Sequence, residues 1–273
     1  RYASDRALPF AIRGGGHAID GNAMPDGALV VDLSGFKSIS VDPATGIAKL
    51  GAGVTLGEMD AALQEHGLVV PSGTVSTTGV AGLALGGGIG YNARRFGMTV
   101  DHMVACDLVT VDGRIVRASE DENADLFWGL RGAGHNLGVV TSFEFRTQKV
   151  GPEVTSGLII YSIDDTHNVL GKIDEFLSTA PRELTIYPVI LPAPPLPGLP
   201  EQMIGVPILV LIVVYTGELS GADEVVAKVA ALGTPLANMV GPTPWVATNG
   251  PAILDVLAPP GRRSHSRGGY IAA

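Results

Sequence analysis

The stretch RGGGHAIDG, residues 13–21, comes directly after the apolar run LPFAI and decides how the rest of the chain is interpreted. Each of its three consecutive glycines loses more backbone freedom on folding than any other residue type, so another interaction must offset that cost. The usual reasons are a tight turn, or a ligand that the bare backbone approaches closely. Successive amide groups can bind an anion, and Arg13 would add positive charge. Taken alone, the motif is better explained by a tight turn that ends in a surface histidine.

Composition narrows the classes of protein to be considered. The chain has 273 residues, 46% of them hydrophobic and 16% charged, which is enough apolar material for one large domain or two modest ones. A net charge of −9 and a pI near 5.1 argue against a nucleic-acid partner. Cys106 is the single cysteine, so no intrachain disulfide can form, which favours a cytoplasmic location.

No membrane partner is expected either. The most apolar stretch, residues 204–217, offers about 11 residues from Pro207 through Gly217, fewer than the roughly 20 that a membrane-spanning helix needs. Its valines and isoleucines predict a buried strand instead. The chain begins without Met and stops at GGYIAA, so we expect both ends to be truncated.

The first half of the chain reads as mostly strands. Periodicity and turn residues predict a helix that starts at Thr55 and ends at Gly67, a hairpin over 105–119 with its turn at Asp112–Gly113, and a short helix over 123–132. Further strands are expected over 8–13, 28–33, two within 39–53, and 137–147.

The character of the sequence changes after about residue 150, where glycine becomes rarer and proline more frequent. Strands are expected over 153–163 and 204–217, and amphipathic helices over 166–181 and 222–233. The Pro-rich segment 191–203 is expected to have no regular structure. We place a domain boundary near Gly151–Pro152, which gives domains 1–150 and 151–273.

Two further glycine-rich segments follow the first motif. The segment PSGTVSTTGVAGLALGGGIGYNARRFG, residues 71–97, has almost no bulky residue between 72 and 82, so it can lie flat against a large planar ligand. A flexible linker is the alternative, but LALGGGIG is too apolar for one. The segment LFWGLRGAGHNLGVVTSFEFR, residues 126–146, reads as a packing motif in which Phe127 and Trp128 enter the core and His135 and Asn136 cap the turn.

A Rossmann unit is a rival interpretation of the second segment. Gly88-Ile89-Gly90-Tyr91-Asn92-Ala93 matches GxGxxA, and Asp107 would be the ribose-binding acid of an NAD(P) site. However, the residues before these glycines are not a Val/Ile-rich strand. Asp107 also begins one strand of a hairpin, DLVTVDGRIV, instead of ending a parallel strand.

All three segments together, in this order, resemble the PCMH-type FAD-binding domain of the vanillyl-alcohol oxidase superfamily, and in particular its berberine bridge enzyme-like branch. The resemblance covers residues 1 to about 150 well. It continues more loosely through 204–217 and LAPPGRRSHSRGGY, residues 257–270. It implies an α+β fold, with a two-part PCMH-type FAD-binding domain that lacks its N-terminal part, followed by a partial α+β substrate domain with an antiparallel sheet.

The resemblance also implies a set of cofactor-binding residues and no metal. The first loop would hold the FAD pyrophosphate through Arg13, Gly14, Gly15 and Gly16, beside Ala18, and His17 would bond covalently to the flavin 8α-methyl. The second segment would line the isoalloxazine and diphosphate through Pro71, Gly73, Thr74, Thr77, Gly79, Val80, Gly82, Leu83, Gly87 and Gly90. Late in the domain, Gly138, Val139 and Val140 would contact FAD by backbone, and Asp101 would be a nearby orienting acid.

One departure from the family pattern affects the covalent link. Many relatives carry a cysteine just after Gly-Thr as a second bond to flavin C6, whereas this chain has Val75 there. Cys106 does not match that position. We therefore expect a single covalent bond, through His17, with non-covalent binding beside the imidazole as the alternative.

The reaction implied by the resemblance is oxidation of a small organic substrate by hydride transfer to flavin N5, followed by reoxidation by molecular oxygen or another acceptor. The substrate would be a sugar, an alcohol or a secondary metabolite. The catalytic base is not identified, because Tyr161, Tyr187, Tyr215 and Tyr270 each read as strand or core residues. An FAD-binding homologue without turnover is the alternative, and the oligomeric state is left open.

Overall fold

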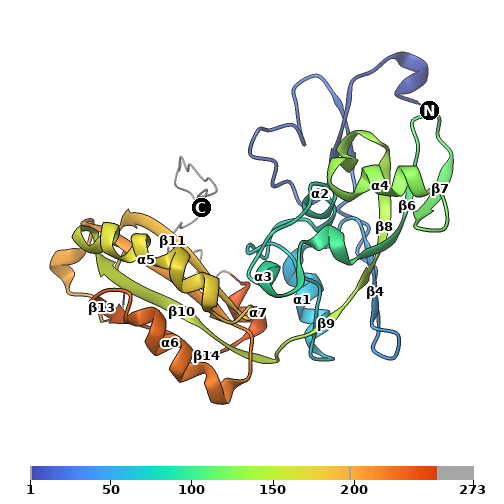
Figure 1. Cartoon of the computed structure of the whole chain (residues 1–273). Helices are drawn as coiled ribbons and strands as arrows, with labels where there is room; N and C mark the ends of the chain where they lie inside the picture. The colour runs from blue at the N-terminus through green and yellow to red at the C-terminus, as the bar shows by residue number, and fades with distance from the viewer. Residues whose placement is uncertain (1, 197, 251–273) are drawn as a thin grey trace. The chain divides into compact units, whose positions relative to one another are not determined.

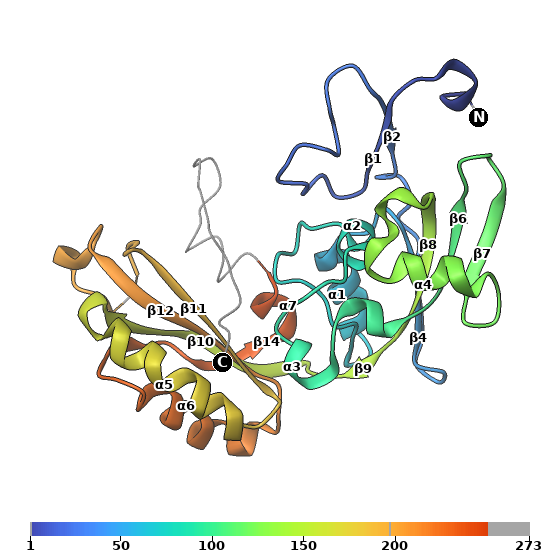
Figure 2. The same cartoon turned by 45° about the horizontal axis from the view of Figure 1, so that its top comes forward.

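The computed structural model describes residues 2–196 and 198–250 and divides the chain into two compact units, Arg1–Gly151 and Pro152–Ala273 (Figures 1 and 2). Helices and sheets occur in both units, which confirms the α+β class. Residues 257–270, including Tyr270, lie outside the described residues.

The first unit is built on a five-stranded antiparallel sheet in the order β3-β4-β8-β6-β7. Two small sheets accompany it: β1 pairs with β2 in parallel, and β5 pairs with β9 antiparallel. The strands are β1 (Phe10–Arg13), β2 (Leu29–Asp32), β3 (Ile39–Asp42), β4 (Ile47–Gly51), β5 (Leu68–Val69), β6 (Met103–Val109), β7 (Ile115–Ser119), β8 (Val139–Arg146) and β9 (Gln148–Lys149). The helices are η1 (Ser4–Arg6), α1 (Leu56–Gln64), α2 (Val80–Leu85), α3 (Ala93–Phe96), η2 (Thr99–His102), α4 (Ala124–Ala133) and η3 (Gly134–Asn136).

Helices α1, α2 and α4 contribute their apolar sides to one hydrophobic core with this sheet. In α1, the spacing of Leu56, Met59 and Leu63 places all three on one face, and all three are fully buried. Thr55 and Glu58 form the capping box that starts the helix.

The prediction that Phe127 and Trp128 both enter the core is half wrong. Phe127 is 3% exposed, but Trp128 is 81% exposed. Both lie on α4, where Phe127 and Leu130 share the buried face. The next residue after Phe127 is turned by about 100° around a helix of 3.6 residues per turn, and Trp128 therefore faces away from the core.

Strand β8 contains an irregularity that the sequence did not predict. Val140 and Phe143 are both in the core, although strict alternation would place residues three apart on opposite faces. The pairing of β8 with β6 shifts register here, because Asp107 is opposite Ser142 while Leu108 is opposite Val140. Thr141 is thus the extra residue of a β-bulge.

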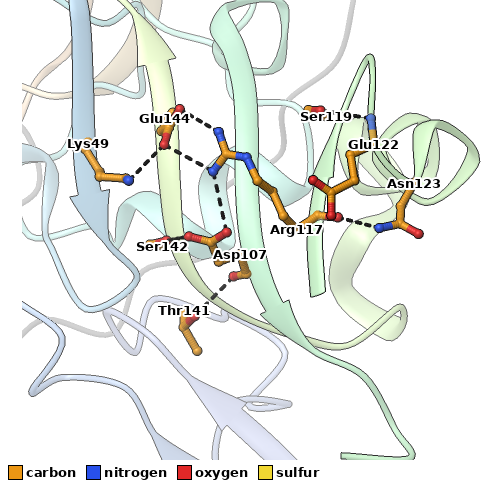
Figure 3. A network of polar contacts seen from close by, with 9 residues as sticks. All are labelled: Lys49, Asp107, Arg117, Ser119, Glu122, Asn123, Thr141, Ser142 and Glu144. Carbon is orange, nitrogen blue, oxygen red and sulfur yellow. Dashed lines mark hydrogen bonds and ion pairs between the residues drawn. The ribbon is translucent and has the colours of Figure 1, made fainter. Parts of the chain in front are cut away.

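A polar network holds this bulge in place (Figure 3). The Thr141 hydroxyl donates to the Asp107 carbonyl at 3.1 Å, and the Ser142 hydroxyl donates to the Asp107 carboxylate at 2.7 Å. Arg117 on β7 donates to Glu144 on β8 at 2.9 and 3.2 Å and reaches Asp107 at 3.5 Å. Lys49 on β4 completes the network with an ion pair to Glu144 at 2.9 Å.

The topology contradicts the Rossmann alternative. Asp107 lies inside β6, which is antiparallel to both of its neighbours, and its carboxylate is engaged by Ser142 and Arg117. The helix after Gly88-Ile89-Gly90 is the four-residue α3, which is too short for the helix of a dinucleotide-binding βαβ unit. The glycines of this segment therefore serve another purpose.

The second unit is a five-stranded antiparallel sheet with α5 and α6 on one face (Figures 1 and 2). The path of the sheet is β11-β12-β10-β13, and β14 also pairs with β10. Its elements are β10 (Glu153–Ser162), η4 (Ile163–Asp165), α5 (Thr166–Thr179), β11 (Leu184–Pro192), η5 (Glu201–Met203), β12 (Pro207–Tyr215), η6 (Leu219–Gly221), α6 (Ala222–Ala230), β13 (Pro235–Asn238), β14 (Gly241–Pro244) and α7 (Trp245–Thr248).

Strand β11 was not predicted, and it extends into the Pro-rich segment that we expected to be irregular. Pro188 and Pro192 interrupt its sequence, so the residue pattern alone does not predict a strand. A proline removes an amide donor, which is tolerated at a sheet edge, and β11 is the edge strand in the order of this sheet. The same segment also contains the short helix η5.

Substituting Arg117 tests the stabilising role of the polar network. The hydrogen bonds from Arg117, followed by those from Lys49, hold the pKa of Glu144 below its ordinary value despite partial burial. A lowered folded-state pKa stabilises the fold above the unfolded-state pKa, and this stabilisation is lost as the pH falls through the folded-state value. We expect Arg117→Met to lower the free energy of unfolding by about 1–2 kcal/mol at pH 7, allowing for partial exposure, and by less at pH 3.

Urea unfolding at the two pH values measures this difference. Arg114→Met is the matched control, because Arg114 pairs with Asp112 in an exposed hairpin turn and should change stability less than Arg117→Met does. An equal loss at pH 7 and pH 3 in Arg117→Met would mean that packing, and not charge, explains the effect.

Candidate functional site

The RGGGH loop begins where the parallel pair of β1 and β2 ends. Arg13 lies opposite Asp32 in this pair, and its guanidinium contacts both carboxylate oxygens at 3.1 and 3.2 Å. The amide and hydroxyl of Ser34, and then the Arg13 guanidinium, hold the pKa of Asp32 below its ordinary value. The charge of Arg13 is therefore largely matched by a neighbouring carboxylate.

The loop meets the second glycine-rich segment backbone to backbone. A Cβ atom built on Gly15 would overlap the Gly79 amide, and one built on Gly79 would overlap the Gly15 amide. Gly79 is the residue that precedes α2. Only a glycine at both positions allows this approach, so the two segments fit together without room for a side chain.

His17 joins the same two segments through its side chain. Its Nε2 lies 2.7 Å from Thr77 Oγ1, and its Nδ1 lies 3.4 Å from Thr78 Oγ1. Thr78 was not among the predicted site residues. A hydrogen bond from the start of α1 holds its backbone, because the Leu56 amide donates to the Thr78 carbonyl at 2.9 Å.

The backbone donors at this junction lack acceptors within the protein. Over residues 2–196 and 198–250, no backbone carbonyl accepts a hydrogen bond from the amides of residues 14–17 or 73–77. Successive amides without protein partners in glycine-rich turns form a typical anion-binding surface. With the hydroxyls of Thr74 and Thr77, this donor set fits the diphosphate of a dinucleotide.

Other predicted glycines are explained by packing inside the protein. A Cβ atom on Gly90 would overlap the Ser72 carbonyl, next to Pro71, and one on Gly73 would lie 2.6 Å from a methyl group of Leu83. Gly87 has a positive φ of 112° and lies against Met98. The backbone contact of Gly90 and the positive φ of Gly87 favour glycine whether or not a ligand is bound, whereas Gly73 faces the methyl groups of leucine side chains.

Gly82 is different from these glycines. It lies in α2 between Ala81 and Leu83, is exposed, and has no atom within 4 Å of the position that its Cβ would occupy. Nothing in the described part of the protein explains the absence of a side chain there. Val80, by contrast, is fully buried in the core, and Val75 is 36% exposed.

The third glycine-rich segment packs against α2. His135 donates from Nε2 to the Gly82 carbonyl at 3.0 Å, and Gly134 lies against Leu85. We had expected His135 only to cap a turn, and the local sequence carries no signal for this long-range bond. Gly138 has a φ of 144° and approaches the Val109 carbonyl.

Val139 and Val140 then enter β8, where both pack on the hydrophobic core. Any contact of theirs with a cofactor would use the backbone, as the resemblance implies. Asp101 lies in η2 and accepts a hydrogen bond from the Met98 amide at 2.7 Å, and Arg131 lies 3.9 Å away. Its carboxylate thus stabilises the turn that follows the second segment.

The remaining candidate side chains can be sorted by their surroundings. Cys106 is buried in the core, and burial raises the pKa of its thiol to about 12, so it is not a nucleophile at neutral pH. Over residues 2–196 and 198–250 there is no group of three or more potential metal ligands, and no helix is long and apolar enough to cross a membrane.

The structure separates the three tyrosines of the second unit that it describes. Tyr161 and Tyr215 belong to the core beneath α5 and α6, and the Tyr161 hydroxyl contacts the Val229 and Ala230 carbonyls at the end of α6 at 3.1 and 3.2 Å. Tyr187 lies opposite Ile212, on the other face of the sheet. Burial raises the pKa of Tyr187.

Comparison with known proteins identifies the class of the first unit. Residues 1–119 match the family model described as an FAD binding domain, so the first unit carries an FAD-binding domain. An FAD-linked oxidoreductase of Dictyostelium discoideum is 31% identical over 272 residues, covering 99% of this chain and 56% of that protein. A xylooligosaccharide oxidase of Thermothelomyces thermophilus is 41% identical over 171 residues, 60% of this chain and 34% of that protein.

Solved structures give the same result for the fold. The 6-hydroxy-D-nicotine oxidase of Arthrobacter nicotinovorans superposes with a TM-score of 0.80 at 30% identity, over 91% of this chain and 53% of that one. BBE-like 1 of Physcomitrella patens gives 0.79 at 28% identity, over 90% and 53%. The first unit therefore carries the FAD-binding domain of FAD-linked oxidoreductases, the chain as a whole is similar to members of that family that include a BBE-like protein, and it spans about half the length of these solved relatives.

Alanine substitutions should distinguish the two kinds of glycine at this site. Gly79→Ala forces a methyl group into the Gly15 backbone and should lower the free energy of unfolding by about 1–3 kcal/mol. Gly82→Ala places its methyl group in open space within a helix, and should leave stability unchanged or raise it by up to about 1 kcal/mol. Urea unfolding of both variants measures the difference, and an equal loss in the two would contradict the assignment.

Proposed function

We propose that the protein is an FAD-dependent oxidase that removes hydride from a small organic substrate and passes the electrons to molecular oxygen. The observation that carries this proposal is the junction of the RGGGH loop with residues 77–79, where unpaired amides, hydroxyls and an imidazole meet. FAD, when bound, supplies the two-electron chemistry. The protein would bind the cofactor, orient it and exclude water from it.

The residues at the junction would have different roles in binding FAD. The amides of Gly15, Gly16 and His17, with those of residues 74–77, would hold the diphosphate by neutral hydrogen bonds. Gly82 would let the cofactor approach α2 closely. Arg13 would orient the loop through Asp32 more than it would supply a free charge to the ligand, because its guanidinium is already paired.

His17 would also attach the cofactor covalently, and it would do so alone. It is exposed and lies beside the unpaired amides of its own loop. Val75 has no nucleophilic atom, and Cys106 is buried with a raised pKa. No second attachment is therefore expected from the residues at this junction.

The substrate class follows the range of the relatives. One relative is named an oxidase of xylooligosaccharides and another an oxidase of 6-hydroxy-D-nicotine. We propose a sugar, an alcohol or a nitrogen-containing secondary metabolite as the substrate of this protein.

Acid precipitation tests the covalent link. We expect flavin colour to stay with the precipitated wild-type protein and to be released completely from His17→Ala, which should still bind FAD before precipitation. Absorbance near the generic flavin band of about 450 nm, read in pellet and supernatant, measures this. Covalent flavin that persists in His17→Ala would place the link on another residue.

Gly82 provides a test of where FAD lies. In the His17→Ala background, Gly82→Leu should weaken FAD binding at least tenfold, corresponding to about 1.4 kcal/mol, because the side chain occupies the proposed ligand volume. Gly171→Leu is the matched control, since Gly171 is also helical with open space at its Cβ position but lies in α5. Fluorescence titration with FAD measures both affinities, and unchanged binding in Gly82→Leu would remove Gly82 from the site.

A further inference from the structure

The two ring nitrogens of His17 have unequal surroundings, and this difference bears on how the residue reacts. Nε2 lies 2.7 Å from Thr77 Oγ1, a normal hydrogen-bond distance, whereas Nδ1 lies 3.4 Å from Thr78 Oγ1, at the outer limit of a contact. A neutral imidazole carries its proton on one nitrogen only, and the partner of that nitrogen sets which one it is. Thr77 therefore has the stronger influence on the ring.

The position of Thr77 is itself fixed by the fold. The next two residues are held on either side: the Thr78 carbonyl accepts from the Leu56 amide at 2.9 Å, and Gly79 packs on Gly15. The Thr78 amide donates to the Val75 carbonyl at 3.0 Å, which closes a turn around residues 76 and 77. The turn at residues 75–78 and the contact between Gly15 and Gly79 thus hold the Thr77 hydroxyl beside His17.

We propose that Thr77 is the positioning residue for His17. It accepts a hydrogen bond from Nε2–H, which fixes the neutral ring in the Nε2–H tautomer and leaves the Nδ1 lone pair as the reactive atom. This tautomer is also the intrinsically favoured form of a histidine side chain. Thr78 competes only weakly for Nδ1 because of its distance, so the lone pair is available for bond formation.

The consequence concerns the attachment of FAD, and in this respect the inference rests on the proposed function. Attachment would form a bond between Nδ1 and the 8α carbon of the flavin. One proton would leave that methyl group and one would leave the imidazole, and the electron pair of the broken C–H bond would pass to molecular oxygen, which would become hydrogen peroxide. Thr77 accepts from the nitrogen that loses its proton, so it is placed to assist this step.

Nitrogen NMR of the histidine rings tests the tautomer without any cofactor. In the full chain labelled with ¹⁵N-histidine and free of FAD, we expect the His17 signals to show a protonated Nε2 and an unprotonated Nδ1, with His17→Gln used to assign them. Thr77→Val removes the hydroxyl at similar size and should give a mixture of both tautomers, and Thr77→Ser should restore the single form. Thr78→Val is the matched control and should leave the signals unchanged.

A second measurement follows the attachment itself. Incubation with FAD and oxygen, followed by mass spectrometry and NMR of the flavin peptide, should show the bond at Nδ1, formed about tenfold more slowly in Thr77→Val, a loss similar to that seen when partners of metal-bound histidines are removed. A wild-type Nδ1–H tautomer, or a flavin bonded to Nε2, would overturn the inference. An Nε2–H tautomer without any covalent flavin would uphold the role of Thr77 and overturn the attachment under the proposed function instead.

Discussion

The contact between Gly15 and Gly79 is the constraint on which the rest of the site depends. Two segments that are far apart in the sequence meet there with no space for a Cβ atom on either. The contact brings His17 to Thr77 and sets the amides of both segments side by side without backbone acceptors. Neither segment alone explains its glycines, because each provides the surface against which the other packs.

The junction also explains how an acidic protein can bind an anionic dinucleotide. The chain has a net charge of −9, and Arg13, the cation nearest to the loop in sequence, is already paired with Asp32. In the proposed site, binding would rely on amide dipoles and hydroxyls, which bind a phosphate without a full opposite charge. Such a surface works only if its donors are held in position, and the sheet pairing of β1 with β2 and the hydrogen bond from Leu56 to Thr78 hold them.

Much of the fold follows from local sequence signals, and the exceptions have tertiary causes. The hairpin of β6 and β7 follows from Asp112–Gly113 at its turn, and α1 from the cap at Thr55. Trp128 could not be placed because both faces of α4 carry apolar residues, and only packing decides between them. Strand β11 was hidden by Pro188, and the bulge at Thr141 has no local signature because its cause is Asp107 on another strand.

Sequence motifs cannot distinguish the glycines of this site, because residues that look identical in the sequence have different surroundings in the structure. Gly15, Gly79 and Gly90 contact other backbone atoms, and the fold would require glycine there even in a protein that bound nothing. Gly82 has open space where its Cβ would lie, so packing among the described residues does not explain the missing side chain. A family pattern assigns all of them to the cofactor because they occur together. Their surroundings differ, however: the packed glycines build the junction, whereas the open space at Gly82 is the reason it is proposed to lie against the cofactor.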